Sequence, residues 1–328
     1  MKPFRDKVAL AVDGGGYRGI MVARALDRLE EHLGVASHDI FSLTAGTSTG
    51  SIISAGIHVG LRAKRIYELY EELGQVVFRK TWRSFWPLSS YKYSNRFLAD
   101  ALRKRLGETS LKDFWASRPD KDLVITVRDL MENRTRFIKP WKIEYGDWTL
   151  WKAVLCSCSV PTYFPVVDGR FVDGGVGAFK NPCYVAAFEA CYCLGWNPET
   201  TTLISIGTGR HEEKFERGHF NRYNPLKWIR PLIDTFISDA DDLQVRVVRK
   251  FFEQLDFRRF QIDIQPIAMD DHSKTEELTA YGDRLGEMIL SDEQDQGVDN
   301  PHGHPLSLIE QNRNESILEK ETPGKTPK

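Results

Sequence analysis

The chain has 328 residues, and its 45 Lys and Arg against 46 Asp and Glu give a net charge of −1. A hydrophobic content of 41% and a charged content of 28% are typical of a globular protein with ample material for a core. A charge this close to zero gives no whole-chain argument for nucleic acid or an anionic surface as a partner. The N-terminal MKPFRDKVALAV has no apolar stretch long enough for a signal peptide or a membrane span.

The cysteine count favours a reducing compartment. Five cysteines without secretory context are an odd number, so we expect free thiols and a cytoplasmic location. The two C-x-C pairs do not have the spacing of a zinc ribbon, and we expect small buried hydrophobic residues rather than a metal site. The residues concerned are Cys156, Cys158, Cys183, Cys191 and Cys193.

The first element is a predicted strand, Lys7–Val12, followed by the glycine-rich loop DGGGYRG and a helix over Ile20–Leu33 that Gly34 ends. The spacing of the loop glycines fits G-x-G-x-x-G, but the acidic ribose ligand that a dinucleotide site needs is missing about 20 residues on. No Gly-Lys-Ser/Thr follows, which excludes a P-loop. The remaining use for the loop is to donate backbone N–H groups to an oxyanion.

The stretch from Ile40 to Gly60 predicts a strand, a tight turn and a helix, with G-T-S-T-G at the turn. This context makes the pentapeptide a nucleophile elbow, in which Ser48 is held in a strained backbone conformation with its hydroxyl exposed. Gly46 and Gly50 flank the serine because a side chain at either position would collide with neighbouring backbone. The alternative is a small-residue turn where a helix packs tightly on a strand.

Strands alternate with helices along the rest of the chain, which predicts a three-layer α/β fold with a mostly parallel central sheet covered by helices on both faces. We expect one domain over residues 1–290 and a polar, disordered tail over 291–328. The further predicted helices are Leu61–Leu73, Asn95–Leu106, Thr149–Cys158, Asn181–Leu194, Ile229–Phe257 and Thr275–Leu290. The further predicted strands are Asp122–Val127, Arg134–Lys139, Val166–Val167, Phe171–Val172, Thr202–Ile206 and Phe260–Ile264.

Two segments mix basic and aromatic residues, Val76–Tyr93 and Arg222–Leu232. Lys and Arg beside Trp and Phe suit a membrane interface. The first segment fits a lid that packs its aromatic side chains on the domain equally well.

A nucleophilic serine needs a base, and the histidines are poorly placed for that role. His211, His219 and His272 follow the serine in sequence, as a triad histidine would, but none stands directly after a convincing strand. Asp173 does, and a buried carboxylate within hydrogen-bond reach of the hydroxyl can act as base directly. A plain Asp-Gly-Gly turn is the alternative.

Three ordered motifs, DGGGYRG, GTSTG and DGG, together with VLCSCSVPTYFPVVDGRFVDGGVGAFKNP and LISIGTGR, resemble the patatin-like phospholipase family. The resemblance implies a lipid acyl hydrolase with a Ser48–Asp173 dyad and neither metal nor cofactor. It places the oxyanion hole at the first loop and the base in the Asp-Gly-Gly motif with Gly174 and Gly175. The implied oxyanion-loop residues are Gly14, Gly15, Gly16, Arg18 and Gly19. Cys156 and Cys158 depart from the alanine or serine expected there.

Within that family, the chain resembles bacterial antiphage effectors that a cyclic nucleotide activates to degrade the inner membrane. This implies a phospholipid substrate, peripheral contact with the inner face of the cell membrane, a cyclic di- or oligonucleotide activator and a homo-oligomer, and no nucleic acid polymer. The nearest alternative is a housekeeping lipid acyl hydrolase. An alternative from another class is a non-catalytic nucleotide-binding module that uses the glycine loop.

Overall fold

The computed structural model of the chain describes residues 1–78, 90–211, 217–218, 223 and 240–295. All elements below belong to one compact unit, Met1–Gln294. Most of the basic-aromatic segment Val76–Tyr93, nearly all of Arg222–Leu232 and the tail after residue 295 lie outside the described residues. The predictions made for them remain predictions.

A seven-stranded sheet forms the centre of the unit, in the order β4-β3-β2-β1-β6-β7, with the short β5 paired to β3. The neighbours from β3 to β7 along this order run parallel, whereas β4 and β5 run antiparallel to β3. This confirms the mostly parallel sheet. The strands are β1 (Lys7–Val12), β2 (Leu43–Thr47), β3 (Asp122–Asp129), β4 (Arg134–Ile138), β5 (Phe171–Asp173), β6 (Thr201–Ile206) and β7 (Asp256–Phe260).

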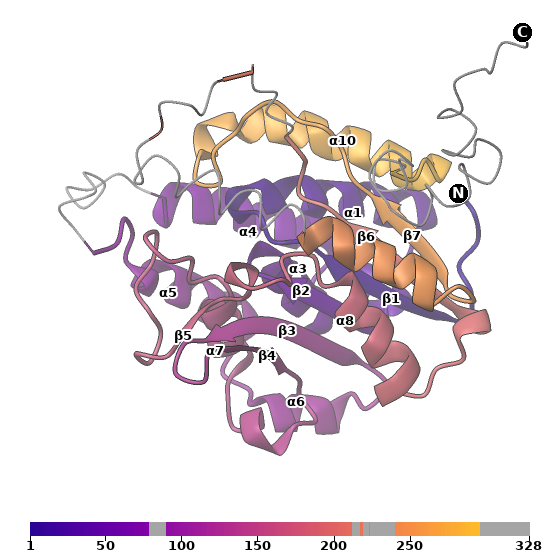
Figure 1. Cartoon of the computed structure of the whole chain (residues 1–328), viewed down its shortest axis with the longest axis horizontal. Helices are drawn as coiled ribbons and strands as arrows, with labels where there is room; N and C mark the ends of the chain where they lie inside the picture. The colour runs from indigo at the N-terminus through magenta and orange to yellow at the C-terminus, as the bar shows by residue number, and fades with distance from the viewer. Residues whose placement is uncertain (79–89, 212–216, 219–222, 224–239, 296–328) are drawn as a thin grey trace, which may run out of the picture. The chain divides into compact units, whose positions relative to one another are not determined.

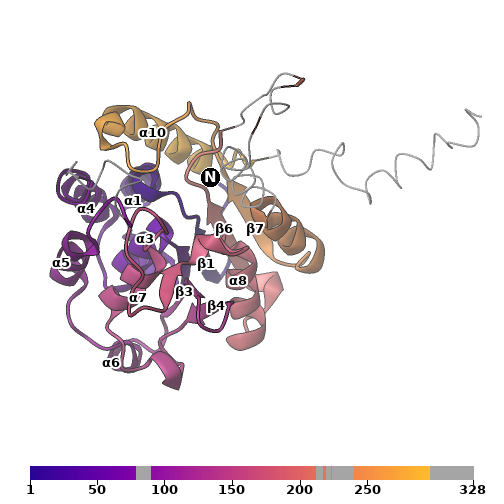
Figure 2. The ribbon, with the colours of Figure 1, turned by 60° about the vertical axis from the view of Figure 1, so that its left-hand side comes forward.

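Helices cover both faces of the sheet, which is why β2 and β6 are buried along their whole length. Figures 1 and 2 show α1, α3, α4 and α10 on one face and α8 on the other. The helices of four residues or more that lie wholly within the described residues are α1 (Gly19–Leu33), α2 (Ser37–Ile40), α3 (Thr49–His58), α4 (Ala63–Val76), α5 (Asn95–Leu106), α6 (Leu111–Ser117), α7 (Leu150–Ser157), α8 (Cys183–Phe188), the π-helix η5 (Glu189–Cys193) and α10 (Thr275–Ser291). Residues 240–251 are helical as well. The single turns are η1 (Gly16–Arg18), η3 (Ile143–Tyr145), η4 (Gly174–Val176), η6 (Pro198–Thr200) and η8 (His272–Lys274).

The glycines of α10 let it lie directly along α1 (Figure 1). A Cβ at Gly282 would come 2.8 Å from the carbonyl oxygen of Met21, and one at Gly286 would come 2.9 Å from Cβ of Arg28. α1 itself ends as predicted at Gly34, which has φ 67° and donates its N–H to the carbonyl of Glu30. The helix that follows the glycine loop is therefore packed against α10, and it also contacts α4.

Four predicted elements were wrong in extent. The last strand is β7 at Asp256–Phe260 and not Phe260–Ile264, and the helix predicted to reach Phe257 ends, in its described part, at residue 251. Val166–Val167 is no strand, because only Val167 forms a bridge, to Phe171. The helix predicted through Leu194 is regular only over α8 and continues as η5.

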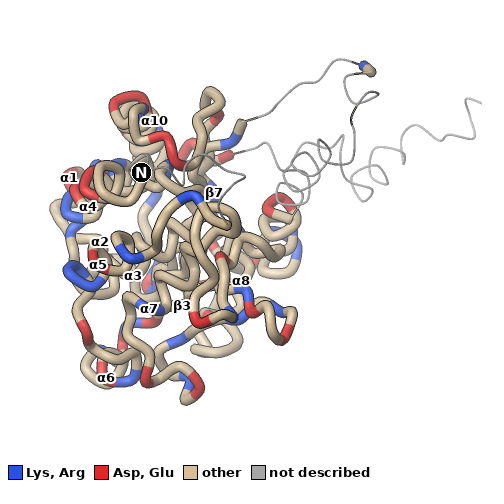
Figure 3. The backbone as a smooth tube through the Cα atoms, turned by 90° about the vertical axis from the view of Figure 1, so that its left-hand side faces the viewer, with Lys and Arg blue, Asp and Glu red and all other residues tan. Residues whose placement is uncertain are grey.

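The prediction that the cysteines are buried is confirmed for three of the five. Cys156, Cys158 and Cys183 are buried as expected, but Cys191 is half-buried and Cys193 is exposed. Lys and Arg are interspersed with Asp and Glu along the described backbone (Figure 3), in line with the net charge of −1. No helix in the described part of the chain is long and apolar enough to span a bilayer.

Candidate active site

Ser48 occupies the turn between β2 and α3 in a conformation that few residues adopt. Its φ of 54° and ψ of −124° are strained for a residue with a side chain, at a cost of about 1–3 kcal/mol. The residue is the N-cap of α3, so the positive end of the helix dipole points toward it. This confirms the strand–turn–helix setting predicted for GTSTG.

The flanking glycines are required by close backbone approach. A Cβ at Gly46 would collide with the carbonyl of Gly50, and a Cβ at Gly50 would collide with the carbonyl of Val12 at the end of β1. Neither neighbour can move away easily, because both atoms belong to backbone. The turn is therefore as tight as the sequence predicted, and it is wedged against the strand that leads into the glycine loop.

Asp173 ends β5 and is almost completely buried, with 3% of its surface exposed. Its Oδ1 accepts the N–H of Gly175 at 2.7 Å, while Oδ2 is buried without a hydrogen bond of good geometry. Burial raises the pKa of the Asp173 carboxyl to about 7, and hydrogen bonding from Ser48 and Gly175 opposes this rise. A carboxyl with a pKa near neutral and a free oxygen beside a serine has the properties of a general base.

The glycine loop presents two backbone donors beside the serine. A Cβ at Gly14 would come 3.2 Å from Cβ of Ser48, so the loop lies against the nucleophile. The N–H of Gly14 already donates to the carbonyl of Lys180 at 2.9 Å. The N–H groups of Gly15 and Gly16 have no partner among the described residues. Of the three consecutive loop glycines, Gly14 to Gly16, these two are therefore the available donors.

Arg18 and Gly19 complete the predicted loop in different ways. The half-buried Arg18 donates from Nε to the carbonyl of Gly15 at 3.3 Å and forms no ion pair with any described residue. It therefore brings an unneutralised positive charge to the loop. Gly19 begins α1 where a Cβ would collide with the hydroxyls of Thr49 and Tyr70, so its contribution is close packing.

A buried ion pair between Asp13 and Arg259 holds the start of the glycine loop. Arg259 in β7 donates from Nη1 and Nη2 to the two carboxylate oxygens of Asp13 at 2.8 and 2.6 Å, and Nη1 also donates to Ser205 at 2.8 Å. The hydroxyl of Thr208 donates to the carbonyl of Gly14 at 2.7 Å. The start of the loop is thus fixed to β6, β7 and the turn after β6, which holds its free N–H groups in place.

Sequence reasoning did not single out Ser157, which links the elbow to the sheet. Its hydroxyl accepts the N–H of Ser48 at 2.8 Å and donates to the carbonyl of Thr126 at 2.7 Å. The same carbonyl would collide with a Cβ at Gly174. The only signal in the sequence was its place in VLCSCSVP, which carries the family resemblance.

An apolar cavity that is partly open to solvent lies beside Ser48, between α3, α4 and the segment after α7. Its walls contain few polar groups, and Ser48 and Gly16 lie at its border. An apolar lining beside a serine suits a hydrocarbon group better than a polar one. Its lining includes Ile52, Leu73, Val77, Phe78, Leu98, Val160 and Phe164.

The histidines His58 and His272 pack against aromatic side chains. His58 at the end of α3 stacks on Phe114, and burial lowers the pKa of its imidazole to about 3. His272 packs edge-on against Tyr17, with ring centres 6.4 Å apart. His219 lies outside the described residues. The carboxyl of Asp173 is the described group whose geometry fits the role of base.

The elbow, the buried carboxyl and the glycine loop are the parts of a serine hydrolase that cleaves carboxylic esters. A family model described as patatin-like phospholipase matches residues 10–187. The chain belongs to this family, as its three motifs predicted. The prediction of an enzyme that hydrolyses lipid carboxylic esters is confirmed at this level.

Two relatives and a solved structure align with most of the chain. "Patatin-like protein 2" of Oryza sativa subsp. indica is 25% identical over 375 residues, covering 95% of this chain and 90% of that protein. The calcium-independent phospholipase A2-gamma of Oryctolagus cuniculus is 25% identical over 292 residues, covering 82% of this chain and 36% of that protein. The structure of VipD from Legionella pneumophila aligns with a TM-score of 0.47 and 13% identity, over 88% of this chain and 67% of that one.

Proposed function

We propose that the protein is a phospholipase A that cleaves fatty acyl esters of membrane phospholipids with a Ser48–Asp173 dyad. The observation that carries this proposal is the strained Ser48 beside the buried Asp173, whose Oδ2 has no hydrogen bond of good geometry, at the border of an apolar cavity. The cavity takes the acyl chain, so that the ester carbonyl lies between the serine and the N–H groups of Gly15 and Gly16.

In the first step, Oγ of Ser48 attacks the carbonyl carbon while Asp173 accepts the hydroxyl proton. The N–H groups of Gly15 and Gly16 and the charge of Arg18 stabilise the oxyanion. Asp173 returns the proton to the leaving alcohol, and an acyl-enzyme ester remains on Ser48. A water molecule then attacks this ester, Asp173 takes its proton, and collapse of the second oxyanion releases the fatty acid. The proton passes back to Ser48.

The test compares Ser48→Ala and Asp173→Asn proteins with His272→Ala on a water-soluble monomeric ester and on phospholipid vesicles. We expect both dyad variants to lose at least about 10³-fold in kcat and the histidine variant to keep its rate. If the histidine variant is inactive and the Asp173 variant is active, a triad replaces the dyad. If the wild-type protein neither hydrolyses esters nor reacts with a fluorophosphonate, the non-catalytic nucleotide-binding module becomes the better model.

We further propose that the enzyme acts at the inner face of the cell membrane as an antiphage effector that a cyclic nucleotide activates. This proposal rests on the family resemblance, and the basic-aromatic segments support its membrane contact. Vesicle hydrolysis is measured with and without cyclic di- and oligonucleotides, together with the oligomeric state. Onset of hydrolysis on addition of one nucleotide supports the effector role. Full activity without any nucleotide identifies a housekeeping hydrolase.

A further inference from the structure

The proposed base is carried by the shortest strand of the sheet. β5 has three residues, and its sheet partner is β3, with Val127 opposite Asp173 and Asp129 opposite Phe171. A three-residue strand has few ladder hydrogen bonds to hold its position. β5 adds to them the bridge between Val167 and Phe171 and the N–H of Asp173, which donates to the carbonyl of Ser159 at 3.0 Å. Catalysis nevertheless requires the Asp173 carboxylate to stay within hydrogen-bond reach of Ser48. Some further contact has to fix β5.

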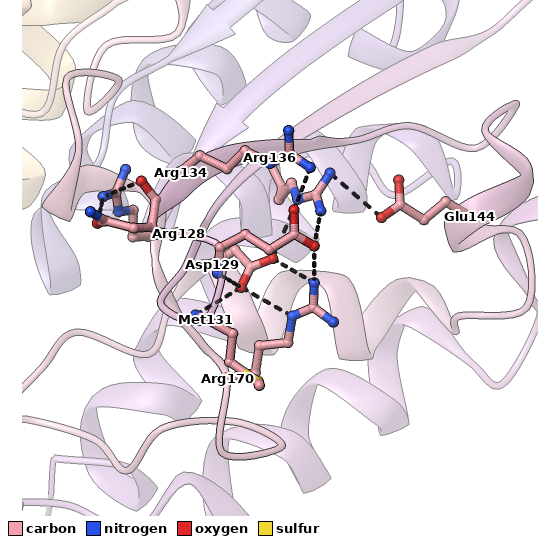
Figure 4. A network of polar contacts seen from close by, with 9 residues as sticks. Arg128, Asp129, Met131, Arg134, Arg136, Glu144 and Arg170 are labelled. Atoms are coloured by element: carbon pink, nitrogen blue, oxygen red, sulfur yellow. Dashed lines mark hydrogen bonds and ion pairs between the residues drawn. The ribbon is translucent and has the colours of Figure 1, made fainter.

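A buried carboxylate on β3 supplies that contact (Figure 4). Asp129 has no exposed surface and accepts five hydrogen bonds. Oδ1 takes Nε of Arg170 at 3.0 Å and the N–H groups of Met131 and Glu132 at 3.1 and 3.2 Å. Oδ2 accepts hydrogen bonds from Nη2 of Arg170 at 2.7 Å and from Nε of Arg136 at 3.3 Å. The carboxylate therefore joins β3, the β3–β4 turn, β4 and the residue before β5.

Arg170 is the member of this network that acts on β5. It precedes the strand directly and stands three residues before Asp173, and its guanidinium meets Asp129 through two parallel hydrogen bonds. Its carbonyl also accepts the N–H of Leu130 at 3.0 Å. A two-point contact between planar groups fixes direction as well as distance, so β5 cannot slide along β3 without breaking both bonds.

We propose that Asp129 and Arg170 are positioning residues, which lock β5 onto β3 and thereby hold the Asp173 carboxylate against Ser48. The inference rests on the proposed Ser48–Asp173 dyad and extends it to a pair that touches neither substrate nor reacting atoms. Loss of the pair leaves the base present but displaced. A displacement of about 1 Å in a catalytic group can lower the rate about 10²-fold.

Two variants remove the two-point contact and leave every residue of the proposed active site unaltered. Arg170→Lys retains the positive charge but replaces the planar fork by a single point of contact. Asp129→Asn retains the shape but turns an N–H group toward the donors of Arg170 or Arg136. The matched control is Glu189→Gln, which breaks another buried ion pair, that of Lys139 with Glu189, away from β5.

The readouts are kcat and KM on a monomeric ester, measured below the unfolding temperature of each variant. The concentration of active sites, by which the rate is divided to give kcat, is titrated with a fluorophosphonate. We expect kcat to fall about 10- to 100-fold in both variants, with KM within about threefold of the wild type. The acid limb of the pH profile should move to lower pH, because a loosened β5 admits water to Asp173. Cys158 after α7 and Lys180 before α8 are the titratable groups that face this segment, and both stay unchanged.

Glu189→Gln should lose stability and keep kcat and the pH profile. The proposal is overturned if Arg170→Lys and Asp129→Asn also keep kcat per titrated site and the acid limb, whatever their stability. If Asp129→Asn yields no folded protein, Arg170→Lys alone decides. An inactive wild-type protein, or an active Asp173→Asn variant, would refute the dyad itself. If Arg170→Lys and Asp129→Asn keep the wild-type kcat while Asp173→Asn is inactive, only the positioning role is refuted.

Discussion

Replacing the proposed base should make the folded protein more stable. Burial raises the pKa of the Asp173 carboxyl to about 7 from 3.8, so its charged form is unfavourable in the folded state. Between these values the unfolded chain releases the proton while the folded protein retains it. The wild type therefore loses stability as the pH rises through this window, by about 1.4 kcal/mol per pH unit. An asparagine carries no such penalty.

The difference amounts to about 4 kcal/mol above pH 7, as an upper limit, because the asparagine amide must still find partners in the buried site. We expect the stability gain of Asp173→Asn to grow by about 2 kcal/mol between pH 5 and pH 7 and to change little further up to pH 9. The assay is urea unfolding of both proteins, followed by tryptophan fluorescence at each pH. A gain that is equal at pH 5 and pH 9 would show that Asp173 ionises normally, and the argument for a neutral-pH base would fail.

Two further changes test how the elbow and the Asp-Gly-Gly motif are held. Ser157→Ala removes the hydroxyl between the N–H of Ser48 and the carbonyl of Thr126, which should cost about 1–3 kcal/mol in unfolding free energy and lower kcat about 10-fold. Gly174→Ala places a Cβ against the carbonyl of Thr126, and we expect loss of activity on a monomeric ester and a lowered unfolding temperature.

Each change has a control that separates packing from function. Ser159→Ala removes another buried hydroxyl, which donates only to the carbonyl of Leu155, and should keep kcat. Ser157→Thr keeps a hydroxyl and should recover most of the rate lost in Ser157→Ala. Equal kcat in all serine variants would mean that the elbow needs no support from α7. A fully active Gly174→Ala protein would mean that β5 and η4 can shift without moving the base.

The sequence predicted those parts of the site that local chemistry determines. Gly34 ends α1, and Gly46 and Gly50 allow a turn that nearly any side chain would block, so these features are legible within a few residues. β7 was misplaced because DFRRF does not look like a buried strand. Arg258 and Arg259 are buried there only because Asp256 and the distant Asp13 pair with them. Contacts across the whole chain carry no local signal.

The site shows the same division between local and distant contacts. Ser48 and Asp173 were predicted from motifs, whereas the role of Ser157 depends on where α7 ends relative to the elbow. The availability of Gly15 and Gly16, and not Gly14, depends on the carbonyl of Lys180. Asp129 and Arg170 come from segments 41 residues apart, and only the register of β5 on β3 brings them together.

The dyad is tested most directly by the rate at which a fluorophosphonate labels Ser48 as a function of pH, with the labelled peptide identified by mass spectrometry. Because a charged Asp173 is needed to take the hydroxyl proton, we predict labelling at Ser48 alone, rising with pH through a midpoint near 7. The rise should be lost in Asp173→Asn and retained in His272→Ala. Labelling of Ser48 at an undiminished rate in Asp173→Asn would contradict the assignment of Asp173 as the base.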